Sequence, residues 1–99
     1  MNAAEKLEVL KTVYPDEAAL DRLLAKVLET VLAEYRSRLQ RYDQALRGFE
    51  TRYAMDSDTF RQRFQGGELG DAMDFFEWAG LYDLRQDLLT KIACLETAV

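Results

Sequence analysis

The stretch TFRQRFQGGELGDAMDFFEW, residues 59–78, decides how this chain folds, because it holds the turn between its last two expected helices. Gly66 and Gly67 are expected to end a short helix, since glycine leaves helical geometry at little steric cost. Asp71 is expected to cap the helix that follows, because an Asp side chain accepts hydrogen bonds from the free amides of a first helical turn. Four carboxylates and the only tryptophan crowd around this turn.

A long helix is expected before this stretch. Apolar side chains recur with a mean step of about 3.6 residues, which is the period of a nearly straight helix and not of a strict heptad. Pro15 favours a helix start, and Asp16 and Glu17 suit the positive end of the helix dipole. The recurring apolar positions are Leu24, Leu28, Val31, Tyr35, Leu39, Tyr42, Leu46, Phe49 and Tyr53.

The length of this helix bears on assembly. An unbroken helix from Pro15 to Tyr53 would be about 58 Å long, which is too long for the rest of one small chain to wrap. A break within residues 36–40 is the alternative, and the absence of Gly and Pro from residues 18–47 disfavours it. Gly48 either lets another backbone pack closely or simply weakens the helix by about 1 kcal/mol.

These patterns predict an all-α chain, built as a long antiparallel helical hairpin with a short connecting helix. Asn2 and Glu5 have the spacing of a capping box before a first short helix. Asp56 or Ser57 can cap the connecting helix. The expected segments of this single domain are a short helix at 1–14, the long helix at 15–55, a second short helix at 57–65 and a last helix at 71–97.

The last helix has more apolar side chains than one packing face needs. Its main stripe, which is expected to pack on the long helix, is Met73, Phe76, Gly80, Leu84, Leu88, Ile92 and Leu95. The remaining apolar side chains are Phe75, Trp78, Leu81 and Tyr82. A helix that is apolar nearly all round must be buried on more than one side. A second chain is therefore expected, either another copy that completes a dimeric helical bundle or a different protein.

Charge narrows the classes of partner. The net charge is −5, which argues against direct nucleic-acid binding, because phosphate contacts need Lys and Arg. The charge is uneven: residues 1–33 carry 4 basic and 6 acidic side chains, residues 34–63 carry 7 and 5, and residues 64–99 carry 2 and 7. The acidic last third suits a basic partner, although acidic residues on exposed helix faces also serve solubility alone.

The remaining composition favours a soluble cytoplasmic protein without a membrane partner. Cys94 is the only cysteine, so no internal disulfide can form, and a buried apolar role is expected for it. The opening MNAAEKLEVL lacks the apolar core of a signal peptide, and no apolar run approaches the length of a membrane span.

Catalysis has little support in the sequence. The chain has no histidine, so neither a Ser–His nor a Cys–His pair can form, and the segment GGELGD lacks the lysine of a phosphate-binding loop. Glu68, Asp71, Asp74 and Glu77 recur every three residues, which would suit Mg²⁺ ligands in a nucleotide pyrophosphohydrolase of the MazG type. A second helix with paired carboxylates is missing, so helix capping and solvation are the favoured roles, and neither a metal nor a cofactor is expected.

The run RYAMDSDTFRQRFQGGELGDAMDFFEWAGLYDL, residues 52–84, resembles the C-terminal signature of small helical proteins encoded beside TumE-type toxins. The shared pattern is F-x-x-G-E-L-G-D-x-x-D-x-F-E-W, which begins here at Phe64. Ala54 stands where the pattern has glycine, and Ala72 replaces the second acid of its GD-D run. The other matched positions are Tyr53, Met55, Phe60, Gly67, Glu68, Leu69, Gly70, Asp71, Asp74, Phe76, Glu77 and Trp78.

The resemblance implies an antitoxin-like protein that neutralises a cognate toxin by covering its active surface. Trp78, Phe75 and Tyr82 would be the apolar anchors on such a partner, inside a rim of carboxylates. The expected partner-binding residues are Phe64, Glu68, Leu69, Asp71, Asp74, Phe75, Phe76, Glu77, Trp78 and Tyr82. The alternatives are a purely structural homodimer, whose two-fold interface buries all the surplus aromatics, and the carboxylate-metal hydrolase.

Overall fold

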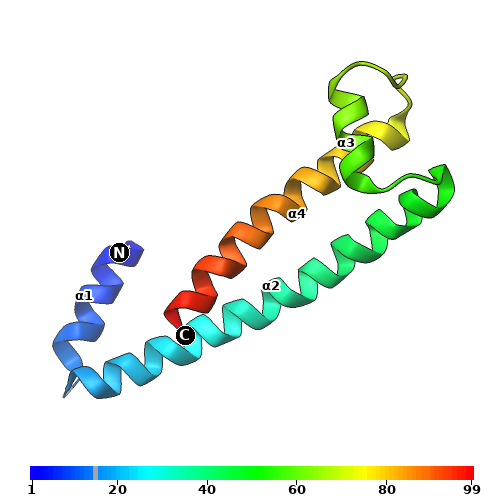
Figure 1. Ribbon diagram of the computed structural model, residues 1–99. Helices are drawn as coiled ribbons and strands as arrows, with labels where there is room; N and C mark the ends of the chain where they lie inside the picture. The colour runs from blue at the N-terminus through cyan, green and yellow to red at the C-terminus, as the bar shows by residue number, and fades with distance from the viewer. Residues whose placement is uncertain (15) are drawn as a thin grey trace.

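The computed structural model describes residues 1–14 and 16–99, and in this part of the chain it contains four helices and no strand. They are α1 (Ala3–Val13), α2 (Glu17–Tyr53), α3 (Ser57–Gln65) and α4 (Met73–Ala98). Figure 1 shows α2 and α4 lying side by side as an antiparallel hairpin, with α3 at the closed end and α1 leaving the open end. The all-α hairpin with a short connecting helix is therefore confirmed. The helix start expected at Pro15 lies outside the described residues.

Helix α2 is continuous over 37 residues, so the alternative with a break in the middle is wrong. Asp16 caps it with a hydrogen bond of 2.7 Å from the Ala19 amide to the carboxylate. Its other end is Ala54, which takes a left-handed conformation with φ of 52°. This is the position where glycine stands in the pattern that the chain resembles, and left-handed geometry is the one that a Cβ atom disfavours.

Aromatic packing closes the hairpin at α3, in a region that we call the tip. The Trp78 and Phe60 side chains are completely buried and stack with ring centroids 3.8 Å apart and an angle of 3° between their planes. The Phe49 ring of α2 also stacks on the indole, with centroids 5.6 Å apart. The cluster of the tip holds Leu46, Phe49, Phe60, Trp78 and Ala79, with Tyr53, Met55, Phe64, Leu69, Phe75, Leu81 and Tyr82 packed around it.

A short chain of hydrogen bonds ties the same three helices together. The Trp78 indole nitrogen donates to the Ser57 hydroxyl at 2.9 Å. Both the hydroxyl and the amide of Ser57 donate to one carboxylate oxygen of Glu50, each at 2.8 Å. The buried polar groups of the tip are thus paired, and no described side-chain nitrogen or oxygen is buried without a partner. Glu50 of α2, Ser57 of α3 and Trp78 of α4 form one continuous link.

The face of α4 that packs on α2 differs from the predicted one. Leu88 and Ile92 are buried against Leu32, as expected. Toward the tip, however, Trp78 and Ala79 are buried while the predicted stripe faces solvent. The indole is the largest apolar side chain of the helix, and its N–H needs a partner that only α3 supplies, so it determines which face turns inward. The predicted positions that are exposed are Met73, Phe76, Gly80 and Leu84.

Four smaller predictions concern the ends and the surface of the helices. The Asn2 and Glu5 capping box of α1 is present, and Asp56 caps α3. Asp71 does not cap α4, because Ala72 occupies the N-cap position with no side-chain hydrogen bond. Cys94 is exposed, so its predicted burial is also wrong.

The molecule is elongated. Its extents are 60 × 24 × 18 Å and its radius of gyration is 19.5 Å, whereas a compact chain of this length has a radius of gyration of about 13 Å. It exposes 7106 Å² of surface, compared with about 5,800 Å² for a compact monomer of this mass. The hairpin thus leaves roughly 1,300 Å² more surface in water than a globule would.

Replacing Ser57 with alanine should destabilise the fold by about 1–3 kcal/mol, because the buried Trp78 N–H then loses its partner. Chemical denaturation measures the effect. Ser37→Ala on the exposed surface of α2 is the matched control and should change the free energy of unfolding by less than about 0.5 kcal/mol. Equal effects of the two substitutions would contradict the proposed link.

Ala54→Gly should stabilise the chain by up to about 1 kcal/mol, because glycine adopts the left-handed conformation of this position without steric strain. Ala45→Gly, in the exposed middle of α2, should instead cost about 1 kcal/mol. Thermal unfolding followed by circular dichroism compares the two. A loss of stability in both variants would show that the left-handed turn at residue 54 carries no strain.

Candidate functional site

The residues of the resemblance pattern mostly contact one another. Tyr53 donates a hydrogen bond of 2.6 Å to Asp74. Phe64 meets Phe76 edge to face, with centroids 5.3 Å apart. The Phe60 ring stacks on the Trp78 indole, as described above. Much of the pattern is therefore explained by the folding of the tip.

The ten predicted partner-binding residues fall into three groups. Trp78 is completely buried, so it cannot be an anchor on a partner while the tip is folded, and that assignment is wrong. Phe64, Leu69, Asp74, Phe75 and Tyr82 are half-buried around the tip. Glu68, Asp71, Phe76 and Glu77 are exposed.

The exposed apolar residues of α4 form a row that we call the outer stripe. It consists of Met73, Phe76, Gly80 and Leu84. Their spacing of three, four and four residues places them on one helix face. The exposed fractions are 81% for Met73, 54% for Phe76 and 52% for Leu84. The sequence singled out these residues by their period but assigned them to the core, so Met73 and Leu84 were missed as surface residues.

Carboxylates surround the outer stripe. Asp71, just before α4, and Glu77, near the start of α4, are both exposed. Asp83 forms an ion pair of 3.1 Å with Arg61, and Asp87 one of 3.1 Å with Lys91. Exposed apolar side chains inside a polar rim are typical of protein-binding surfaces. The negative rim favours a partner with a basic surface.

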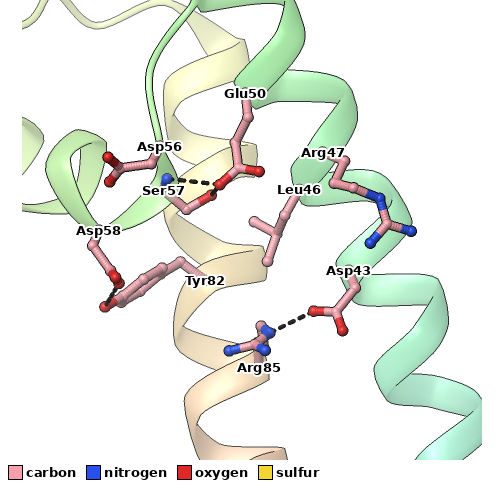
Figure 2. Close-up of a pocket in the computed structure, with 9 residues that line it drawn as sticks. All are labelled: Asp43, Leu46, Arg47, Glu50, Asp56, Ser57, Asp58, Tyr82 and Arg85. Carbon is pink, nitrogen blue, oxygen red and sulfur yellow. Dashed lines mark hydrogen bonds and ion pairs between the residues drawn. The ribbon is translucent and has the colours of Figure 1, made fainter.

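A polar cleft of about 320 Å³ lies on another side of the tip (Figure 2). It is lined by Asp43, Leu46, Arg47, Glu50, Asp56, Ser57, Asp58, Tyr82 and Arg85. Each carboxylate in this lining already has a protein partner. Asp43 pairs with Arg85, Asp58 accepts from the Tyr82 hydroxyl at 2.8 Å, and Asp56 caps α3 at the Thr59 amide.

These bonds hold the three helices together at the cleft. Tyr82 of α4 is an example, since it donates a hydrogen bond to Asp58 of α3. This hydrogen bond, together with burial, raises the pKa of the Tyr82 hydroxyl. Among the described residues no group of three or more Cys, Asp or Glu side chains is placed to hold a metal ion. The carboxylates at 68, 71, 74 and 77 thus do not converge: Asp74 faces α2, and Glu68 lies 4.0 Å from Arg63.

Asp74 connects the start of α4 to the end of α2. Besides the Tyr53 hydroxyl, it accepts a hydrogen bond of 2.8 Å from Arg52. The hydrogen bond from Tyr53 and then that from Arg52 lower the pKa of the Asp74 carboxyl. A lowered pKa in the folded state means that the carboxylate stabilises the fold above its unfolded pKa and loses this contribution as the pH falls through the folded value.

Asp74→Asn should lower Tm at neutral pH, because the amide cannot form the ion pair with Arg52. The Tm values of the variant and the wild type should converge as the pH falls through the folded-state pKa of Asp74, which lies below the ordinary value of an aspartate. Calorimetry across this range measures the convergence. Asp71→Asn, three residues earlier and exposed, is the control and should leave the dependence of Tm on pH in the acid range unchanged. A Tm difference for Asp74→Asn that stays constant with pH would contradict the role of its charge.

Comparisons with protein-family models, with curated proteins and with solved structures find no match for this chain. Within the described residues, no helix has both the length and the hydropathy that crossing a bilayer requires.

Proposed function

We propose that this chain is an antitoxin-like protein that binds and neutralises a cognate toxin by protein–protein contact. The observation that carries the proposal is the outer stripe of α4, which is apolar, exposed and surrounded by carboxylates. The resemblance of residues 52–84 to proteins encoded beside TumE-type toxins supplies the class of partner. No catalytic step by this chain is needed, because occupying a surface is sufficient for neutralisation.

The charge of the last third of the chain supports a basic partner. Toxins that act on RNA bind phosphates through Lys and Arg, so an acidic surface can occupy the same place. Residues 64–99 carry 2 basic and 7 acidic side chains, which gives this part of the chain a net charge of −5. The charges would steer the encounter, and the stripe would supply the apolar area that is removed from water on binding.

The stripe can be altered without touching the core. Phe76 and Leu84 are each about half exposed, so replacing both with alanine should leave the helical content unchanged. The loss of two apolar contacts should weaken partner binding by roughly 10- to 100-fold. Val99→Ala is the matched control, because Val99 has a similar exposed fraction of 50% at the far end of the chain.

The test starts by recovering the tagged chain from its host together with the protein that adheres to it. The recovered partner should be small and basic, and its expression alone should arrest growth. Growth should be restored by the wild-type chain and by Val99→Ala, and not by the Phe76→Ala, Leu84→Ala double variant. Full rescue by the double variant would refute the assignment of the stripe, and a partner that does not affect growth would refute the antitoxin role.

A further inference from the structure

Helix α2 extends well beyond the end of α4. Arg36 of α2 forms an ion pair of 3.4 Å with Glu96 of α4. Because Glu96 lies two residues before the last residue of α4, Ala98, α4 ends close to the position of Arg36 along α2. The first four turns of α2, residues 17–31, therefore lie past α4 and extend over about 22 Å. Figure 1 shows this free end of the hairpin, with only α1 beside it.

Apolar side chains cover this free segment. Val27 is 51% exposed. The half-buried apolar side chains of the segment are Ala19, Leu23, Leu24, Ala25, Leu28 and Val31. In the hairpin, α4 covers such positions of α2 further along, where Leu32 is buried in one cluster with Leu88 and Ile92. Within residues 17–31 Leu20 is buried, and the rest of this apolar surface has no helix of the length of α4 to cover it.

Helix α1 does not complete the packing. None of the described residues of α1 is buried. Leu7 is 37% exposed, Val9 45% and Val13 65%. We call α1 together with residues 17–31 of α2 the arm. The arm exposes apolar side chains on both of its helices, which an isolated chain in water would not favour.

The exposed area matches what a dimer requires. The chain exposes roughly 1,300 Å² more than a compact monomer does, and a stable dimer buries about 800 Å² of each partner. One interface of standard size would therefore remove most of the excess. Closed two-fold dimers are also the commonest assemblies of soluble proteins, since one self-complementary patch is sufficient to form them.

Charge selects the arm and not the outer stripe as the self-complementary patch. A two-fold axis places a surface against itself, so two acidic tips would repel each other. The arm is closer to neutral: residues 1–31 carry 4 basic and 6 acidic side chains, a net charge of −2, whereas residues 71–87, which hold the outer stripe, carry 1 basic and 5 acidic side chains, a net charge of −4. Lys26 and Arg22 stand among the apolar residues of the arm itself.

We infer that the arm is an interface between two copies of this chain, in which each copy covers residues 17–31 of the other. The two tips then lie at opposite ends of the dimer and remain free. The inference rests on area, exposure and charge, and it holds whether or not the proposed function is correct.

Val27→Glu and Leu84→Glu form a reciprocal test, because both side chains are about half exposed, on different helices. Light scattering over a concentration series should give twice 11.4 kDa for the wild type and for Leu84→Glu, and 11.4 kDa for Val27→Glu. A wild-type chain that is monomeric at every concentration would overturn the inference. Dissociation of Leu84→Glu in place of Val27→Glu would assign the interface to the outer stripe and would overturn it equally.

Two further measurements guard against a variant that misfolds. Val13→Glu changes a side chain that is 65% exposed, so it should preserve the circular dichroism spectrum and still abolish the dimer. Cys94 is exposed and is the only cysteine, so donor- and acceptor-labelled chains can be mixed directly. Energy transfer should appear in the wild type and in Leu84→Glu and be lost in both arm variants. Undiminished transfer in both arm variants would contradict the inference.

Discussion

The hydrogen bond from the Trp78 indole to Ser57 is the contact on which the rest of the structure depends. Two long helices joined through a short helix and two turns have many ways to rotate against each other, and apolar area alone does not choose among them. The indole N–H must find a partner when it is buried. Because Ser57 in turn is held by Glu50, the rotation of α4, the position of α3 and the end of α2 are determined together.

The rotation of α4 about its own axis also determines which of its residues lie on the surface. Once Trp78 points inward, the residues about half a turn away from it, including Phe76 and Gly80, must point outward. The outer stripe is therefore a consequence of how the core is built. This explains why a pattern that contains both sets of residues carries two kinds of information: Tyr53, Phe60 and Trp78 close the tip, while Phe76 and Glu77 stand on its outside.

The sequence predicted the features that depend on local rules. The 3.6-residue period predicted the unbroken α2, the capping box at Asn2 is where its spacing predicted it, and Asp56 is the cap of α3 out of the two residues expected there. The inward face of α4 was not predictable in this way, because two apolar stripes compete on that helix and only tertiary contacts decide between them. The predictions of burial for Cys94 and of capping for Asp71 were wrong for the same reason. A residue type favours burial or capping on average, but its surroundings in the fold determine the outcome.

The elongated shape separates a surface that suits a second copy of the chain from a surface that suits a basic partner. A surface that must meet its own copy cannot carry a large charge of one sign, whereas a surface that meets a basic partner gains from it. The chain holds both kinds, a weakly charged arm and the acidic outer stripe of α4, near opposite ends of a molecule 60 Å long. This distance exceeds the Debye length of about 8 Å at physiological ionic strength. The charge of the outer stripe therefore does not oppose association at the arm, and one small chain can self-associate at one end while it binds a different protein at the other.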